Sequence, residues 1–80
     1  MLRLSILSVL VFGGARTLGE LAAAEQVRPP TMTRLVQALE RDGLVRREAD
    51  ASDGRVVRIH ATALGRRLLY EGRARRVAVL

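Results

Sequence analysis

Residues 29–43, PPTMTRLVQALERDG, constrain the fold of this chain more than any other stretch. Proline is well tolerated in the first turn of a helix, where its missing N–H group would have no partner. The large apolar residues that come next follow the spacing of a single helical stripe: Met32, Leu35, Val36 and Leu39. Gly43 can end the helix in a left-handed conformation. The sequence therefore predicts an amphipathic helix over residues 29–42, which needs a body to pack against.

A shorter helix is predicted just before it, over residues 18–25. The stretch TLGE fits a capping box, in which the Thr17 side chain accepts a hydrogen bond from the backbone N–H of Glu20 and the Glu20 carboxylate accepts one from the N–H of Thr17. Two residues of this helix are expected to face inward: Leu21 and Ala22. Residues 26–28 leave room only for a tight turn, so the two helices form a helix-turn-helix pattern.

The apolar pattern changes from a helical period to a strand period after this unit. Residues 44–47 and 56–60 predict two short strands, and the polar residues 50–54 predict the turn between them. Thr62 can cap a last helix, which is expected to begin near Ala63. Two leucines of that helix are expected to face inward: Leu64 and Leu68. The arginines of its outer half are expected to be surface charges: Arg66, Arg67, Arg73, Arg75 and Arg76.

The first fifteen residues, MLRLSILSVLVFGGA, admit two interpretations. A single positive charge at Arg3, an apolar run over residues 4–12 and the small residues that follow are typical of a secretory signal peptide. The same run has four apolar residues close to one helical stripe: Leu4, Leu7, Leu10 and Val11. Cleavage near Ala15 would remove this stripe from the core of the domain that follows. We therefore expect a first core helix and a protein that stays in the cytoplasm.

Composition excludes several classes of function. The chain has 80 residues, enough for one small domain that buries about 60% of its unfolded surface. It has no cysteine and a single histidine, His60, so neither disulfide bonds nor a thiolate or histidine metal site is expected. The sequence offers no nucleophile with a partner, no metal cluster and no phosphate-binding loop, so we expect neither an enzyme nor a cofactor. No segment approaches the roughly 20 apolar residues that span a bilayer.

The net charge of +6, with 14 arginines, no lysine and eight acidic residues, favours a polyanionic partner. A helix can enter the DNA major groove if its exposed face carries side chains that reach bases and phosphates. The helix over residues 29–42 offers such side chains opposite its apolar stripe: Thr31, Thr33, Arg34, Gln37 and Arg41. Arg34 can donate two hydrogen bonds to guanine, and Gln37 can pair with adenine. The arginines of the hairpin over residues 46–58 either reach the flanking backbone and minor groove or form only a solvated face.

The order and spacing of these elements give the chain a specific resemblance. The motifs are LGELA, PPTMTRLVQALERDGLV, the wing motif Asp53-Gly54-Arg55 and the closing residues ATALG at 61–65. On these motifs, the sequence resembles the winged helix-turn-helix core of the multiple antibiotic resistance regulator (MarR) family. The resemblance implies a mainly α-helical fold with a small β-hairpin, in which a three-helical core and a wing precede a C-terminal helix. It also implies a dimeric, sequence-specific transcriptional regulator, often a repressor, that releases double-stranded DNA when a small phenolic ligand binds.

The resemblance assigns DNA contacts to particular residues. The recognition-helix contacts of the family correspond to Thr31, Thr33, Arg34 and Gln37. The wing arginine that enters the minor groove corresponds to Arg55, with Asp53 holding its guanidinium. With the neighbouring polar and basic residues, the predicted DNA-binding set is as follows: Thr17, Arg28, Pro30, Thr31, Thr33, Arg34, Gln37, Arg41, Asp53, Arg55 and Arg58. Arg28 stands where the family usually has a capping serine, which costs about 1 kcal/mol and can add a phosphate contact.

The resemblance covers the DNA-binding lobe only. Family members dimerise through a further N-terminal helix and two long C-terminal helices, so we interpret residues 1–80 as a single winged helix-turn-helix domain truncated at both ends. A homodimer and a small phenolic ligand are expected on the resemblance alone. An open reading frame upstream that encodes another helix would mean that Met1 is an internal methionine or a misassigned start. Two alternatives stay open: a protein-interaction module or non-DNA-binding remnant of such a regulator, and a secreted basic peptide.

Overall fold

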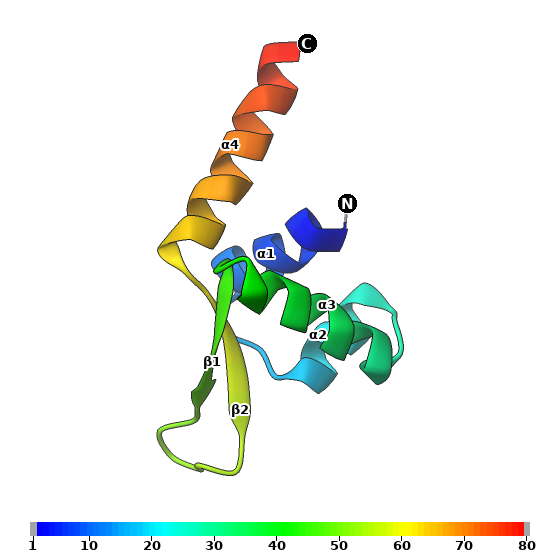
Figure 1. Cartoon of the computed structure of the whole chain (residues 1–80), viewed down its shortest axis with the longest axis vertical. Helices are drawn as coiled ribbons and strands as arrows, with labels where there is room; N and C mark the ends of the chain where they lie inside the picture. Colours follow the sequence, from blue (N-terminus) through cyan, green and yellow to red (C-terminus); the bar gives the residue numbers. More distant parts are fainter. Residues whose placement is uncertain (1, 80) are drawn as a thin grey trace.

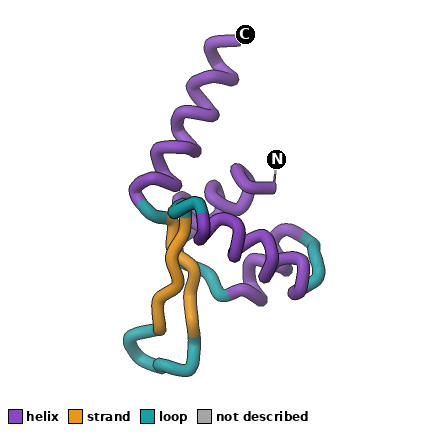
Figure 2. Tube along the Cα trace, in the orientation of Figure 1, coloured by secondary structure: helices purple, strands orange, loops and turns teal. Residues whose placement is uncertain are grey.

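The computed structural model describes the backbone of residues 2–79 and the side chains of residues 2–72. The elements follow one another as α1 (Leu2–Gly13), α2 (Leu18–Glu25), α3 (Pro29–Arg41), β1 (Val45–Ala49), β2 (Val57–Ala61) and α4 (Ala63–Val79). Helices α1, α2 and α3 form the body, while the hairpin of β1 and β2 and the far part of α4 project from it in opposite directions (Figure 1; Figure 2). The predicted surface arginines at positions 73, 75 and 76 lie outside the described side chains.

The hydrophobic core draws residues from every helix and both strands. Its buried members are Ile6, Leu7, Leu10, Leu21, Ala22, Met32, Val36, Leu39, Leu44, Val45, Ile59 and Leu69. Within residues 2–72, no polar or charged residue is buried as a whole. A core of this kind is held together by the removal of apolar surface from water.

Helix α1 is a core helix, as predicted. Leu7 and Leu10 are buried, and Leu4 and Val11 are half-buried against the core. Ile6, which lies off the predicted stripe, is fully buried as well. The reason is that α1 contacts α2, β2 and α4, so its covered face is wider than one stripe.

Helix α2 has the predicted bounds, and both hydrogen bonds of the capping box are present. The Glu20 N–H donates to Thr17 Oγ1 over 3.1 Å, and the Thr17 N–H donates to Glu20 Oε1 over 2.9 Å. Leu21 and Ala22 are buried as predicted. The helix ends at Gln26, whose φ of 56° lies in the left-handed region and turns the chain toward α3. The helix-turn-helix prediction is confirmed.

Helix α3 begins with two prolines in its first turn, and Arg28 at its N-cap position makes no side-chain capping bond. Three residues of the predicted stripe are buried, and the fourth, Leu35, is half-buried against the core. Gly43 has a φ of 75°, and the N–H groups of Gly43 and Leu44 close back onto the last turn over 2.9 Å each. This is the pattern of a Schellman C-cap. The predicted helix and its glycine stop are confirmed.

The two strands form the predicted hairpin, which is the wing. Val45 lies opposite Ala61, and the strands run antiparallel. Both strands begin one residue later than predicted, and β1 extends two residues further. The shift has a local cause. The N–H of Leu44 still caps the end of α3, and the N–H of Val56 closes the turn by donating to the Asp53 carbonyl over 3.0 Å. Each strand therefore begins at the next residue.

A single-residue bridge fastens the base of the wing to the body. The N–H of Arg16 donates to the Ile59 carbonyl over 3.2 Å, and the Ile59 N–H donates to the Arg16 carbonyl over 2.6 Å. Ile59 is fully buried at this point. The sequence gives no sign of the bridge, because one residue has no period to recognise.

Helix α4 starts at the predicted cap, with the Gly65 N–H donating to Thr62 Oγ1 over 3.1 Å. The prediction that Leu64 faces inward is wrong, because its side chain is 49% exposed. Gly65 faces inward instead and lies against the Leu44 carbonyl, where a Cβ atom would approach the oxygen to 2.2 Å. The residue one helical turn later, Leu69, is therefore the buried leucine, and the predicted Leu68 is only half-buried.

Candidate nucleic-acid interface

The outer face of α3 carries Arg34, Gln37 and Arg41. A helix advances 100° per residue, so these three lie opposite the stripe of buried residues. All three are exposed, and neither Arg34 nor Arg41 has an ion pair among the residues whose side chains are described. Their hydrogen-bond donors are therefore available to a partner outside the chain.

The first turn of α3 adds Arg28, Pro30 and Thr31, all of which are exposed. Pro29 and Pro30 carry no N–H group and the Met32 N–H donates to the Arg28 carbonyl, so an anion here would be attracted mainly by the Arg28 guanidinium and the positive end of the helix dipole. Thr33 differs from these residues, since it is half-buried and its hydroxyl donates to the Pro29 carbonyl over 3.1 Å. Its donor is engaged within the helix, although its oxygen can still accept a hydrogen bond.

The tip of the wing presents Arg55. The side chain is 93% exposed, and Asp53 Oδ1 accepts from its Nε over 3.3 Å and from its backbone N–H over 3.1 Å. The Asp53–Arg55 pair implied by the resemblance is thus present. Asp53 holds the stem of an arginine whose terminal nitrogens face solvent, and the tip of the wing is basic.

Arg58 behaves differently from Arg55. Its side chain is only 36% exposed, and its guanidinium lies between two carboxylates. Nε donates to Asp50 Oδ1 over 3.0 Å, and Nη1 donates to Glu20 Oε1 over 3.5 Å. Glu20 belongs to the capping box with Thr17, so Thr17 is the start of a polar network that runs from α2 into the wing.

Two carboxyl groups of this network have lowered pKa values. The pKa of Asp50 lies well below its usual range, because the Ser52 hydroxyl, the Arg58 guanidinium and the N–H groups of Ser52 and Asp53 all donate to it. The pKa of Glu20 is lowered mainly by the Thr17 N–H. Hydrogen bonds to an ionised carboxylate favour that form. Both groups therefore stay ionised to a lower pH than an unperturbed carboxyl group.

The remaining wing arginines are paired locally. Arg46 forms an ion pair with Glu48 on the same strand, and Arg47 Nε donates to Glu40 Oε1 of α3 over 2.8 Å. The second pair holds β1 beside the last turns of α3.

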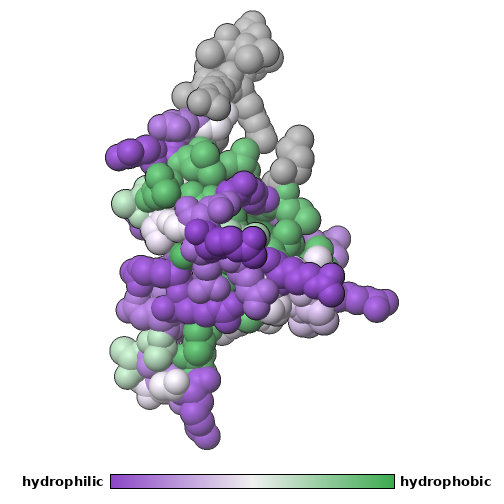
Figure 3. All heavy atoms as spheres, viewed as in Figure 1, coloured by the Kyte–Doolittle hydropathy of each residue, from purple (hydrophilic) through white to green (hydrophobic). Residues whose placement is uncertain are grey.

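Figure 3 shows hydrophilic residues across the band over α3 and at the tip of the wing, with hydrophobic residues gathered where α1 meets α4. In the described part of the chain, the arginines without an ion pair therefore lie away from the strand faces that carry Arg46 and Arg47.

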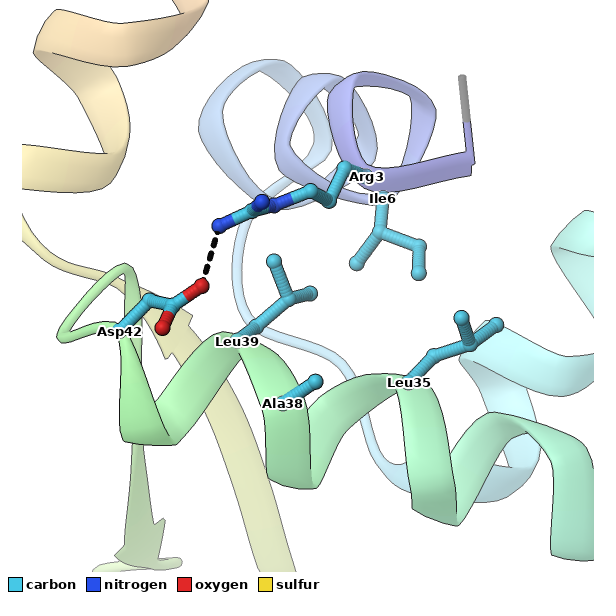
Figure 4. A pocket seen from close by; sticks show the side chains of 6 residues that line it. All are labelled: Arg3, Ile6, Leu35, Ala38, Leu39 and Asp42. Carbon is cyan, nitrogen blue, oxygen red and sulfur yellow. Dashed lines mark hydrogen bonds and ion pairs between the residues drawn. The ribbon is translucent and has the colours of Figure 1, made fainter.

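A small pocket of about 160 Å³ lies behind α3. It is lined by Arg3, Ile6, Leu35, Ala38, Leu39 and Asp42. Arg3 reaches from α1 to Asp42 at the end of α3, with an Nη2–Oδ2 distance of 2.5 Å, and the apolar side chains form the wall beside this ion pair (Figure 4). The pocket therefore has an apolar lining and one charged edge.

Other kinds of site find little support in the described residues. Among the side chains of residues 2–72, no group of three His, Cys, Asp or Glu residues is placed to hold a metal ion. None of the described helices is long and apolar enough to cross a membrane. His60 is half-buried on β2, and no hydrogen bond to its side chain is found among the described residues.

A helix-turn-helix with a basic outer face, followed by a two-stranded hairpin, defines the class of winged helix-turn-helix proteins. The sequence model of the MarR family matches residues 1–57. The chain belongs to the MarR family. An uncharacterised helix-turn-helix-type transcriptional regulator of Mycobacterium leprae is 42% identical over 74 residues, which is 92% of this chain and 52% of that protein. The chain spans about half the length of the curated relatives it matches.

Solved structures support the same fold. The YusO protein from Bacillus subtilis matches with a TM-score of 0.89 at 28% identity, over 96% of this chain and 55% of that chain. The transcriptional regulator Tm0710 from Thermotoga maritima matches with a TM-score of 0.89 at 31% identity, over 96% of this chain and 54% of that chain. A complex of Staphylococcus aureus MepR with DNA matches with a TM-score of 0.83 at 30% identity, over 90% and 60% of the two chains.

Proposed function

We propose that this chain is the DNA-binding part of a transcriptional regulator. The observation that carries the proposal is the outer face of α3, where Arg34, Gln37 and Arg41 are exposed and the two arginines are unpaired among the described residues. The fold shared with a regulator solved in complex with DNA supports it. In this proposal α3 enters the major groove, and the wing lies along the adjacent minor groove or backbone.

The proposed contacts divide by chemistry. Arg34 and Gln37 read base edges, because a guanidinium and an amide can each form two hydrogen bonds to one base. Arg55 enters the minor groove, where a narrow A·T-rich stretch has a strong negative potential. The positions proposed to bind phosphates or sugars are Thr17, Arg28, Pro30, Thr31, Thr33 and Arg41. Phosphate contacts supply most of the affinity, and base contacts supply the sequence preference.

The experiment begins with selection of preferred duplexes from a randomised pool by the purified chain. Binding of the selected and of unrelated duplexes is then measured by fluorescence anisotropy at several salt concentrations. We expect Arg55→Ala to weaken binding to all duplexes by about tenfold. We expect Arg34→Ala to weaken the selected duplex by more than the unrelated one, at a cost of about 1–3 kcal/mol.

A charge-matched control is Arg67→Ala on α4, since Arg67 is exposed and lies outside the proposed contacts. It should change affinity only slightly. If Arg34→Ala and Arg55→Ala behave like Arg67→Ala, the assignment of these contacts is wrong. If the wild-type chain is folded and monomeric and binds no duplex at low salt, the alternative of a protein-interaction module is favoured.

We also propose that the regulator works as a homodimer, since a dimer doubles the half-sites it can contact. Leu64 and Tyr70 on α4 are 49% and 52% exposed, and Tyr70 also packs edge-on against Phe12 of α1, so a second copy could cover apolar surface on this helix. Gel filtration with light scattering at increasing protein concentration tests the proposal. A mass that stays at that of one chain at all concentrations would contradict dimerisation by the chain alone.

A small phenolic ligand is proposed for the pocket between α1 and α3. A volume of about 160 Å³ is close to that of an apolar cavity known to accept one benzene ring, and a phenolic hydroxyl can donate to Asp42 of the Arg3–Asp42 pair at its edge. Phenol and benzoate are suitable probes by titration with NMR detection. Shifts at Leu35 and Leu39 that disappear in Ala38→Leu, which fills the pocket, would support the site. A fall in DNA affinity on binding of the probe would show that the ligand releases the regulator from DNA.

A further inference from the structure

Arg58 joins the wing to the body of the domain through side chains far apart in the sequence. Its Nη1 lies 3.5 Å from Glu20 Oε1, at the N-terminal end of α2, and its Nε lies 3.0 Å from Asp50 Oδ1, at the end of β1. The same Glu20 oxygen accepts the Thr17 N–H. The position of Arg58 is thus determined from both sides, by the capping box and by the wing.

The network continues from Asp50 to the tip of the wing. Asp50 Oδ2 accepts from the N–H of Ser52 over 3.0 Å and from the N–H of Asp53 over 3.1 Å, and the Ser52 hydroxyl donates to it as well. Asp53 in turn accepts from both the backbone and the side chain of Arg55. A continuous series of hydrogen bonds therefore leads from α2 to the arginine at the tip.

Backbone hydrogen bonds close the outer part of the wing on itself, from the Asp50 N–H to the Val56 carbonyl over 2.8 Å and from the Val56 N–H to the Asp53 carbonyl over 3.0 Å, but they do not fasten it to the body. Ala49 and Val57, which face each other at the end of the strands, are both exposed, and the apolar core stops at Ile59. A two-stranded hairpin is marginally stable at best without a packed face. The orientation of the tip must therefore depend on polar contacts to the body.

We infer that Arg58 is a positioning residue, which fixes the wing against α2 and so presents Arg55 to DNA in one place, and does not itself bind a phosphate. The inference rests on the proposed function, because it assumes that Arg55 contacts DNA. A preordered loop loses less conformational entropy when it binds. Arg58 also has two of its donors engaged with carboxylates, whereas Arg55 keeps its terminal nitrogens in solvent.

The Asp50→Asn variant distinguishes a positioning role of Asp50 from a direct effect of its negative charge on DNA. Loss of a negative charge beside DNA should tighten binding or leave it unchanged if Asp50 acts only through its charge. If Asp50 holds Arg58 and the tip, the variant should instead weaken binding by about fivefold to tenfold. The charge-matched control is Glu71→Gln on α4, which lies outside the network and should not weaken binding. Equal behaviour of the two variants would overturn the inference.

Arg58→Lys tests whether the charge of residue 58 is sufficient. Lysine keeps a positive charge for a phosphate, but it lacks the fork that bridges two carboxylates. We expect Arg58→Lys to lose about as much affinity as Asp50→Asn. Wild-type affinity in this variant would mean that residue 58 acts as a charge beside DNA.

A double-mutant cycle with Arg55→Ala shows whether Arg58 acts through Arg55. Residues that act through one another give non-additive effects. We expect Arg58→Lys to weaken wild-type binding but to add less than about twofold in the Arg55→Ala background. A full, additive loss in that background would show that Arg58 contacts DNA independently and would refute the positioning role.

A readout without DNA keeps failure of the proposed function distinguishable from failure of this inference. Amide hydrogen exchange at Ser52 and Asp53 is measured by NMR in the wild-type chain and in Arg58→Lys. If the network orders the tip, exchange at both amides should be about tenfold faster in the variant, while exchange at Leu39 in the core stays unchanged. Unchanged exchange at the tip would overturn the inference whether or not the chain binds DNA.

Discussion

Gly65→Ala perturbs the contact that sets the rotation of α4. A Cβ atom at this position would lie 2.2 Å from the Leu44 carbonyl oxygen and 3.1 Å from Leu7 Cδ2. The oxygen belongs to the backbone and accepts the Thr62 N–H over 3.0 Å, so it cannot rotate away. The helix and the loop before the wing must therefore separate by roughly 1 Å to restore an ordinary contact.

The expected change in the free energy of unfolding for Gly65→Ala is the sum of three contributions. Overpacking of a tight contact costs about 1–3 kcal/mol, and weakening of the hydrogen bond to Leu44 costs about 1 kcal/mol. Alanine regains about 1 kcal/mol of helix propensity over glycine. The net loss for Gly65→Ala is about 2 kcal/mol, which lowers the Tm of a domain of this size by roughly 8–16 °C. The assay is thermal unfolding followed by far-UV circular dichroism.

Gly72→Ala is the matched control on the same helix. Its Cβ would meet Leu4 Cδ1 at 3.4 Å, which is an ordinary contact with the end of a flexible side chain. This variant should keep or raise the Tm, because it gains helix propensity without a clash. If Gly65→Ala is as stable as Gly72→Ala, α4 does not pack against Leu44 as described, and the explanation of the exposed Leu64 fails with it.

Three further predictions concern the left-handed turn at Gln26, the N-cap of α3 at Arg28 and the stability of the domain at low pH. Gln26→Gly should stabilise the fold by about 1 kcal/mol, because glycine adopts a φ of 56° without strain; an unchanged Tm would contradict it. Arg28→Ser should stabilise α3 by about 1 kcal/mol by supplying the missing cap, yet weaken DNA binding at low salt. The lowered pKa values of Asp50 and Glu20 mean that their stabilisation is present above the usual values of 3.8 and 4.5 and is lost as pH falls below them. The Tm of the wild-type chain should therefore fall as the pH is lowered, and it should fall less steeply in Asp50→Asn. An equal dependence of Tm on pH in the two proteins would count against the network.

Local signals in the sequence predicted the helix-turn-helix almost completely. The capping box and the two prolines fix where α2 and α3 begin, because each depends on residues within one turn. Gly43 fixes the end of α3 for the same reason. The apolar stripe of α3 also gave its outer face, so the exposure of Arg34 follows directly from the sequence.

The features that the sequence did not reveal depend on distant contacts. The rotation of α4 is set by the approach of Gly65 to Leu44, which no periodicity encodes. The network of Arg58 joins side chains 38 positions apart, and Glu20 was recognised only for its capping role. The register of the hairpin places Glu48 opposite Arg58, so pairing across the strands would have pointed to Glu48 and not to Asp50.

The salt dependence of DNA binding by the intact chain tests the central claim most directly. Four outward arginines, Arg28, Arg34, Arg41 and Arg55, are proposed to displace counterions from phosphates or groove edges. The account predicts that the logarithm of the binding constant falls with the logarithm of salt concentration with a slope of about −3 to −4, and that each of these arginines replaced by alanine reduces the slope by about one. A folded chain with a slope near zero, or without affinity for DNA at about 50 mM salt, would contradict it.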